Sequence, residues 1–217
     1  MAEDVVVVVA GGEAPRPEAA RAVPPGAPVV AADGGLEHAR ALGLEVALAV
    51  GDFDSASPEA VAAAEVAGIR VEQHPAEKDA TDLELALDAA LALAPQRILV
   101  LAGDRGRLDH LLSLVHVLGL ERYAGAELDA WIGPAQVHVI RGERTLGGTP
   151  GELVSLLALH GAAEGVTTEG LAYPLAGERL EAGSSRGVSN LFVAATARVA
   201  VARGLLLAVR PGPEERS

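Results

Sequence analysis

Short apolar runs alternate with helical segments through the first 132 residues of the chain. The first run, residues 5–9, is five consecutive valines. Continuous β-branched runs of this length are typical of strands buried on both faces, as in parallel sheets. We therefore predict an N-terminal domain with a mostly parallel, layered α/β sheet. The predicted strands are residues 5–9, 28–31, 46–50, 69–72, 97–101 and 127–132.

Helix signals lie between these runs. Ser57 is a favourable N-cap with Pro58 at the first helical position. Thr81 and Glu84 have the spacing of a capping box, so a helix should begin at Thr81. The other predicted helices are residues 16–23, 36–42, 57–67 and 109–120.

The pattern changes after Gly133 and Pro134. Beyond them helical periodicity is weak, and short apolar runs recur between turns that contain glycine. Such a pattern predicts a small C-terminal antiparallel β-sandwich or barrel, so we expect two domains, residues 1–133 and 134–217. The predicted runs are residues 136–141, 152–159, 165–168, 188–195, 197–202 and 205–209.

The composition limits the kinds of partner that the protein can be expected to bind. The formal net charge is -13, which argues against nucleic-acid and anionic-membrane partners because these bind clustered Lys and Arg. An acidic surface suits a protein that holds cations, although it also simply favours solubility. There is no cysteine, which excludes disulfides and thiol nucleophiles. An acidic start and the lack of a run of ~18 apolar residues make a cytoplasmic protein the expectation.

Carboxylates follow several of the predicted strands. Because the carboxyl ends of parallel strands meet at one edge of a sheet, acids from separate loops can converge there. Clustered carboxylates need a cation, and Mg²⁺ takes oxygen ligands while bridging carboxylates to phosphates. Glycines and the cations Lys78, Arg105 and Arg107 nearby can approach phosphate oxygens. The acids are Asp33, Asp52, Asp54, Asp79, Asp82 and Asp109.

Each acid also has a purely structural interpretation. Asp33 and Asp109 each precede a predicted helix and can be simple N-caps. Asp54 can cap the Ser57 region or form an Asx turn, and the acids around Thr81 can merely favour a helix start. The coincidence of four such loops favours a shared metal and polyphosphate site. In the second domain, the polar stretch 183–190 can ring a heterocycle, but a hairpin explains it better on sequence alone.

The motifs as a set resemble the thiamine pyrophosphokinase (thiamine diphosphokinase) family over nearly the whole chain. The most specific part is GDFDS at residues 51–55 followed by KDATD at 78–82. The other matching motifs are Asp33-Gly34-Gly35, Gly106-Arg107-Leu108-Asp109-His110 and Ser189-Asn190.

The resemblance implies a homodimer that uses Mg²⁺ and transfers pyrophosphate from ATP to the thiamine hydroxyl. It implies an α/β catalytic domain that binds the nucleotide, and a β-sandwich for thiamine binding and dimerisation. The metal and catalytic cluster would be Asp52, Asp54, Asp79 and Asp82. The ATP side would be Asp33, Gly34, Gly35, Lys78, Arg107, Asp109 and His110. The thiamine side would be Ser184, Ser185, Ser189 and Asn190.

Two positions depart from the family pattern. Arg105 stands where the family often has Gly, which adds a phosphate contact or points to solvent. Ala182 stands where many members carry Trp, so a stacking wall for thiamine is missing or comes from elsewhere. Two rival functions stay open at this point. Residues 52–55 also fit an aspartyl-phosphate phosphatase motif with Asp52 as nucleophile, and a thiamine- or nucleotide-binding sensor would keep the pocket without turnover.

Overall fold

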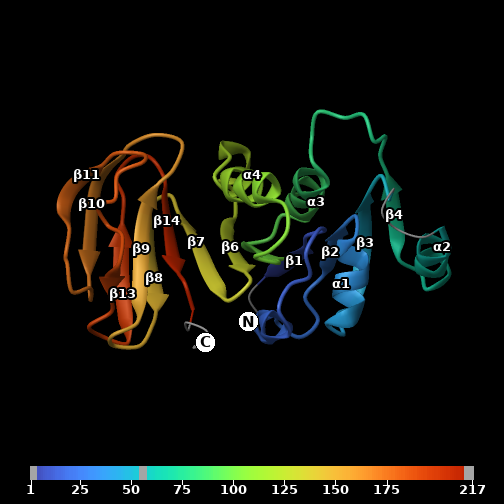
Figure 1. Cartoon of the computed structure of the whole chain (residues 1–217), viewed down its shortest axis with the longest axis horizontal. Coiled ribbons are helices and arrows are strands. Elements are labelled where there is room, and N and C mark those ends of the chain that lie inside the picture. Colours follow the sequence, from blue (N-terminus) through green and yellow to red (C-terminus); the bar gives the residue numbers. More distant parts are fainter. Residues whose placement is uncertain (1–3, 54–57, 213–217) are drawn as a thin grey trace. The chain divides into compact units, whose positions relative to one another are not determined.

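The computed structural model describes residues 4–53 and 58–212, and these divide into two compact units (Figure 1). The first unit comprises residues 1–114 and 125–133, and the second comprises 115–124 and 134–217. Residues 115–124, the end of one helix and the turn after it, therefore belong with the second unit although they precede the predicted boundary at 133. The functional roles predicted for the two domains stay a prediction.

The first unit is a parallel sheet whose strands alternate with helices along the chain (Figure 1). Its strand order is β6-β5-β1-β2-β3-β4, and every neighbouring pair is parallel. The predicted α/β fold is confirmed here. The strands are β1 (Val5–Val9), β2 (Val29–Ala32), β3 (Val46–Gly51), β4 (Arg70–Gln73), β5 (Arg97–Ala102) and β6 (Glu127–Ile132).

The strand order of this sheet reverses at β1. From β1 the chain proceeds through β2, β3 and β4 on one side, and β5 and β6 lie on the other. Ligands of open α/β sheets bind outside the carboxyl ends of the strands at such a switch point. Because β1 lies between β5 and β2, this point is inside the sheet, and all five valines of β1 are buried.

Helices and short 3₁₀ turns connect the strands of the first unit. The segment 16–23, predicted as a helix, is a 3₁₀ helix without a side-chain cap. The helices are η1 (Pro17–Ala22), α1 (Gly35–Ala41), α2 (Pro58–Val66), α3 (Asp82–Leu91), α4 (Leu108–Leu118) and η2 (Glu121–Tyr123). Ser57, the predicted cap of α2, lies outside the described residues.

The predicted capping box at the start of α3 is confirmed. The backbone N–H of Glu84 donates to Thr81 Oγ1 at 3.3 Å, and the Thr81 N–H donates to Glu84 Oε2 at 3.1 Å. Because α3 follows directly on Lys78 and Asp79, the box also fixes where this loop ends.

We expect Thr81→Ala to lower the free energy of unfolding by about 1 kcal/mol, because one helix N–H loses its acceptor. Urea unfolding followed by circular dichroism measures the change. Thr81→Ser keeps the hydroxyl and should stay within a few tenths of a kcal/mol of the parent. An equal loss in both variants would contradict the capping role.

The second unit is an antiparallel β-sandwich, as predicted. One sheet contains β12-β9-β14-β7 and the other β11-β10-β13-β8. Apolar side chains of both sheets share one core, in which Phe192 and Leu156 are among the largest buried groups. The strands are β7 (Ala135–Ile140), β8 (Glu143–Gly147), β9 (Leu153–Ala158), β10 (Ala163–Glu169), β11 (Ala176–Leu180), β12 (Asn190–Leu191), β13 (Thr196–Ala200) and β14 (Leu206–Arg210).

Candidate active site

Three loops at the carboxyl edge of the first unit meet around Asp33, Asp52 and Lys78. The N–H of Asp33, directly after β2, donates to Val50 O in β3 at 2.8 Å. A Cβ on Gly51 would lie only 3.1 Å from the Cα of Asp33, so glycine lets the two loops come this close. The N–H of His74, after β4, donates to Gly51 O at 2.8 Å. The convergence expected from strand ends is thus present for β2, β3 and β4.

Lys78 links two of the predicted carboxylates. Its Nζ donates to Asp52 Oδ2 at 3.0 Å and lies 2.9 Å from Asp82 Oδ1. All three side chains are largely covered, with 14% of Lys78, 16% of Asp52 and 26% of Asp82 exposed. Burial lowers the pKa of Lys78, but its contacts with Asp82 and Asp52 outweigh burial and leave the pKa raised. Lys78 therefore carries its charge throughout the neutral range.

This cluster provides oxygen donors suited to Mg²⁺. Asp82 Oδ1 is buried, and its contact with Lys78 Nζ at 2.9 Å is an ion pair. Mg²⁺ is commonly held by one or two carboxylates together with substrate phosphates. The donor set thus fits the metal. Among residues 4–53 and 58–212, no group of three or more His, Asp or Glu side chains is placed to hold a metal.

The two remaining acids of the predicted metal cluster are placed differently. Asp79 is exposed in the loop between β4 and α3. Asp54, predicted as a metal ligand and catalytic residue, lies outside the described residues, as does Ser55 of the same motif. Their roles stay predictions.

The two glycines after β2 differ in their surroundings. Gly34 is the N-cap of α1, so Asp33 is not the simple helix cap that the sequence allowed. A Cβ on Gly35 would lie 2.2 Å from Val9 O, which means that only glycine allows the first turn of α1 to abut β1. Gly34 has open space around it and remains able to approach a ligand.

Arg107 and Asp109 form a two-point ion pair where the loop after β5 enters α4. Arg107 Nη2 donates to Asp109 Oδ2 at 2.6 Å and its Nε to Oδ1 at 3.2 Å. The pair is exposed, as is His110 beside it. Hydrogen bonding from Arg107 lowers the pKa of Asp109 to about 2 and raises that of Arg107. Asp109 lies in the first turn of α4, which begins at Leu108, so it pairs with Arg107 and is not the N-cap that the sequence allowed.

We expect the Asp109 carboxyl to titrate near pH 2, since its pKa in the folded protein lies below the ordinary 3.8. The pairing with Arg107 is fully present above the ordinary value and is lost as pH falls through about 2. Carbon-13 NMR of the aspartate carboxyl groups measures the midpoint. Arg107→Gln should return it towards 3.8, whereas Arg105→Gln, on an exposed neighbour, should not. An unshifted midpoint in Arg107→Gln would contradict the assignment.

Sequence reasoning missed one pair at the switch point. Arg16, in the loop after β1, lies 3.4 Å from Asp104 in the loop after β5. A Cβ on Gly103 would lie 2.6 Å from Glu13 O, so these two loops are also tightly packed. Residue spacing alone did not indicate Asp104, because its partner is 88 positions away.

The residues predicted for thiamine gather around a pocket of about 220 Å³ in the second unit. Ser185 and Asn190 line it, together with Tyr173, Leu175, Arg186, Gly187 and Val188. Ser184 and Ser189 are the sequence neighbours of these lining residues; Ser184 Oγ accepts from the Arg186 N–H, and the Ser189 N–H donates to Ser155 Oγ. The stretch 183–190 is therefore a turn that shapes a pocket.

Asn190 holds the opposite wall of this pocket. It is 2% exposed, its Oδ1 accepts from the Tyr173 N–H at 2.9 Å, and its Nδ2 donates to Tyr173 O at 2.8 Å. Tyr173 itself is 64% exposed and lines the pocket. This aromatic side chain was not identified from the sequence, since a single Tyr in a glycine-containing loop has no distinguishing pattern.

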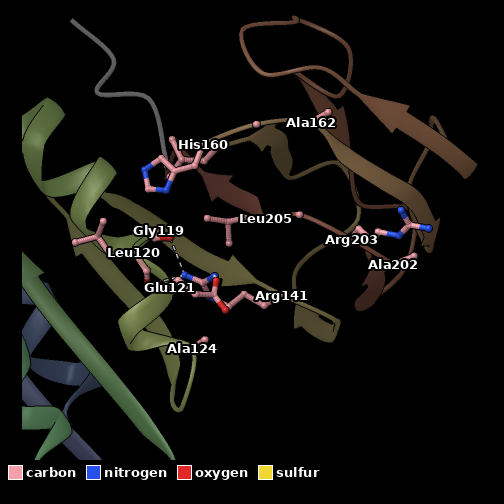
Figure 2. Close-up of a pocket in the computed structure, with 13 residues that line it drawn as sticks. Gly119, Leu120, Glu121, Ala124, Arg141, His160, Ala162, Ala202, Arg203 and Leu205 are labelled. Atoms are coloured by element: carbon pink, nitrogen blue, oxygen red, sulfur yellow. Dashed lines mark hydrogen bonds and ion pairs between the residues drawn. The ribbon is translucent and has the colours of Figure 1, made fainter.

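A larger hollow of about 700 Å³ lies elsewhere in the second unit (Figure 2). Arg141 lies on its lining and donates to the carbonyls of Gly119 and Leu120 and to Glu121 Oε2, at 2.7, 2.8 and 2.7 Å. The stacked rings of His116 and His160 are 5.4 Å apart at its border. None of the predicted site residues lines this hollow, so its size does not make it the candidate site.

Fold and site together define a class: a two-unit α/β and β-sandwich protein with an acidic, lysine-containing site suited to metal and polyphosphate. Residues 26–127 match the model of the thiamin pyrophosphokinase catalytic domain, and residues 137–206 match the thiamin pyrophosphokinase vitamin B1 binding domain. The chain belongs to the thiamin pyrophosphokinase family. Both halves match in the order expected for one enzyme, which is a transferase.

Individual relatives agree with this assignment. Thiamine pyrophosphokinase of Bacillus subtilis is 28% identical over 174 residues, covering 75% of this chain and 77% of that protein. A crystal structure from Bacillus subtilis matches with a TM-score of 0.84 at 24% identity, covering 97% and 100% of the two chains. That from Geobacillus thermodenitrificans gives 0.81 at 27% identity, covering 97% and 99%.

Proposed function

We propose that the protein transfers the pyrophosphoryl group of ATP to the hydroxyl of thiamine, forming thiamine diphosphate and AMP with Mg²⁺. The observation that carries this proposal is the Lys78 bridge between Asp52 and Asp82. It joins the loops after β3 and β4 into one charged site within the unit that matches the catalytic-domain model. A site for nucleotide alone would not need paired carboxylates around a cation.

The reaction exchanges one bond to phosphorus for another. The thiamine hydroxyl oxygen attacks the β-phosphorus of ATP, the bond from that phosphorus to the α–β bridging oxygen breaks, and AMP leaves with this oxygen. The hydroxyl proton goes to a carboxylate, for which Asp54 and Asp79 are the candidates. Positioning and electrostatic stabilisation supply most of the rate enhancement in such transfers.

Different residues of the first unit would bind the metal and the phosphates. Asp52 and Asp82, with Asp54 and Asp79, would hold Mg²⁺, which neutralises charge on the transferring group and orients it. Lys78 and Arg107 would bind phosphate oxygens. Asp33, Gly34, Gly35, Asp109 and His110 would form the rest of the ATP side, with Gly35 acting through packing.

In the second unit, Ser184, Ser185 and Ser189 would contact thiamine, and Asn190 would hold Tyr173 as a wall of its pocket. Tyr173 is the aromatic group available to this pocket, where Ala182 stands in place of the family's Trp. The homodimer implied by the resemblance and the cytoplasmic location expected from the sequence are parts of the same proposal. No helix in the described part of the chain is long and apolar enough to cross a membrane.

AMP release from ATP tests the function directly. We expect AMP formation only when thiamine and Mg²⁺ are both present, with thiamine diphosphate formed in equal amount. Phosphate release without thiamine would support the aspartyl-phosphate phosphatase, and thiamine binding without AMP would support the sensor. Neither alternative finds support in the family match, which covers both units.

A further inference from the structure

Lys78 is the only lysine of the chain; every other residue in the Lys and Arg total is arginine. It is also the best covered member of the cluster, with 14% of its side chain exposed. A chain that uses arginine at every surface ion pair has thus kept an ammonium group at one position. That position lies between two carboxylates from different loops.

The ammonium of lysine and the guanidinium of arginine contact carboxylates differently. Arginine presents a planar fork of separate nitrogens, so it reaches two carboxylates through different atoms, as Arg198 does with Glu143 through Nη2 and with Glu169 through Nη1. Lysine presents a compact point charge on a flexible stem. In Lys78 a single nitrogen lies 3.0 Å from Asp52 Oδ2 and 2.9 Å from Asp82 Oδ1, so one positive centre is shared by both carboxylates. A cation bound between carboxylate oxygens shares its charge in the same way, although Mg²⁺ is smaller and doubly charged.

The ion pairs of Lys78 use oxygens that would also hold the metal. Its ammonium contacts Asp52 Oδ2 and Asp82 Oδ1, and the latter oxygen is buried. The same contacts place Lys78 in competition with a divalent cation for the same oxygens.

We propose that Lys78 is a placeholder cation. It holds Asp52 and Asp82 together by ion pairs until Mg²⁺ binds; it then releases both carboxylates, and its ammonium group binds the polyphosphate. The proposal rests on the proposed function, in which these carboxylates hold the metal. It assigns Lys78 two successive partners, whereas a purely structural ion pair would keep one arrangement throughout.

Mg²⁺ binding without nucleotide gives the first test. By isothermal titration calorimetry, Lys78→Met should bind Mg²⁺ roughly tenfold more tightly than the parent, since the competing charge is gone. Arg70→Met is the matched control, because Arg70 pairs with Glu72 on exposed β4. It should leave the dissociation constant unchanged. An equal or weaker affinity in Lys78→Met, with circular dichroism like that of the parent, would overturn the proposal.

The second test uses the unmodified protein, so it holds even if Lys78→Met fails to fold. Protein labelled with carbon-13 at lysine Cε gives one NMR signal for its one lysine. We expect this signal to shift saturably with Mg²⁺ alone and to shift again with Mg²⁺ and ATP. A signal unmoved by Mg²⁺ at concentrations that saturate the calorimetric titration would exclude the placeholder role.

The AMP assay separates the two levels of inference. Thiamine-dependent AMP formation together with a lysine signal that Mg²⁺ does not move would reject the placeholder and keep the transferase. Absence of AMP formation would reject the proposed function, whatever the lysine signal does.

Discussion

Asp52→Asn should lower the rate of AMP formation by about 10²–10³-fold while leaving the fold intact. The substitution keeps the size and polarity of the side chain but removes the charge that binds Lys78 and, in the proposed reaction, Mg²⁺. Asp52 follows β3 directly, and its backbone carbonyl also accepts from Gln73 Nε2 at 3.4 Å. Because this backbone contact does not involve the carboxylate, the loop should keep its conformation.

The measurement is steady-state AMP release at saturating ATP and thiamine, repeated over a range of Mg²⁺ concentrations. We expect the Mg²⁺ concentration at half-maximal rate to rise as the maximal rate falls. Asp4→Asn, on an exposed residue of the same unit, is the matched control and should retain parental rates. Near-normal turnover of Asp52→Asn, with parental Mg²⁺ dependence, would show that the metal assignment is wrong.

The parallel sheet could be predicted because strands buried on both faces appear in the sequence as continuous apolar runs. β1 is five buried valines, and β5 is almost as apolar. Two strands of the sandwich, β8 and β11, contain no such apolar run. β8 and β11 are the edges of their sheet, and their sequences, ERTLG and AGERL, each contain an adjacent Glu and Arg and only one large apolar residue. Edge strands with one exposed face carry charges, so the search for apolar runs passes over them.

The segment 188–195, predicted as a strand, shows the opposite error. Its apolar content suggested a full strand, but the strand is limited to Asn190–Leu191, as β12, and Phe192 adds an isolated bridge to Leu171. Ser189 has a φ of +59°, which breaks the extended conformation immediately before the pair. A local backbone reversal of this kind is set by contacts such as the Ser189 N–H with Ser155 Oγ, which are distant in sequence.

The candidate site was predictable to the level of its loops. Strand ends and acid spacing predicted that the loops carrying Asp52, Lys78 and Asp82 meet, and in the structure Lys78 contacts both acids, while the roles of these residues stay predictions. The partner of each charge was not predictable, because spacing does not reveal that one ammonium bridges two loops. Asp104 and Tyr173 were missed since neither belongs to a motif, and their neighbours come from remote segments.

Asn190→Ala should lower the free energy of unfolding by about 3 kcal/mol and raise the KM for thiamine more than tenfold, on the scale expected when a buried hydrogen-bonded group is lost. The Asn190 amide satisfies both the N–H and the C=O of Tyr173 as well as the N–H of Leu191. Alanine leaves these backbone groups without their partner in a buried position. The loop that carries Tyr173 would lose its attachment, and the pocket would lose a wall.

Two comparisons separate this role from a direct contact with thiamine. Ser155→Ala removes one hydrogen bond beside the same pocket and should cost only about 1 kcal/mol, with a KM close to that of the parent. Tyr173→Ala removes the wall but keeps its backbone attachment, so it should raise KM while largely preserving stability. If Asn190→Ala altered KM without altering stability, Asn190 would instead act on thiamine directly, since a buried amide that anchors a loop cannot be removed without loss of folding free energy.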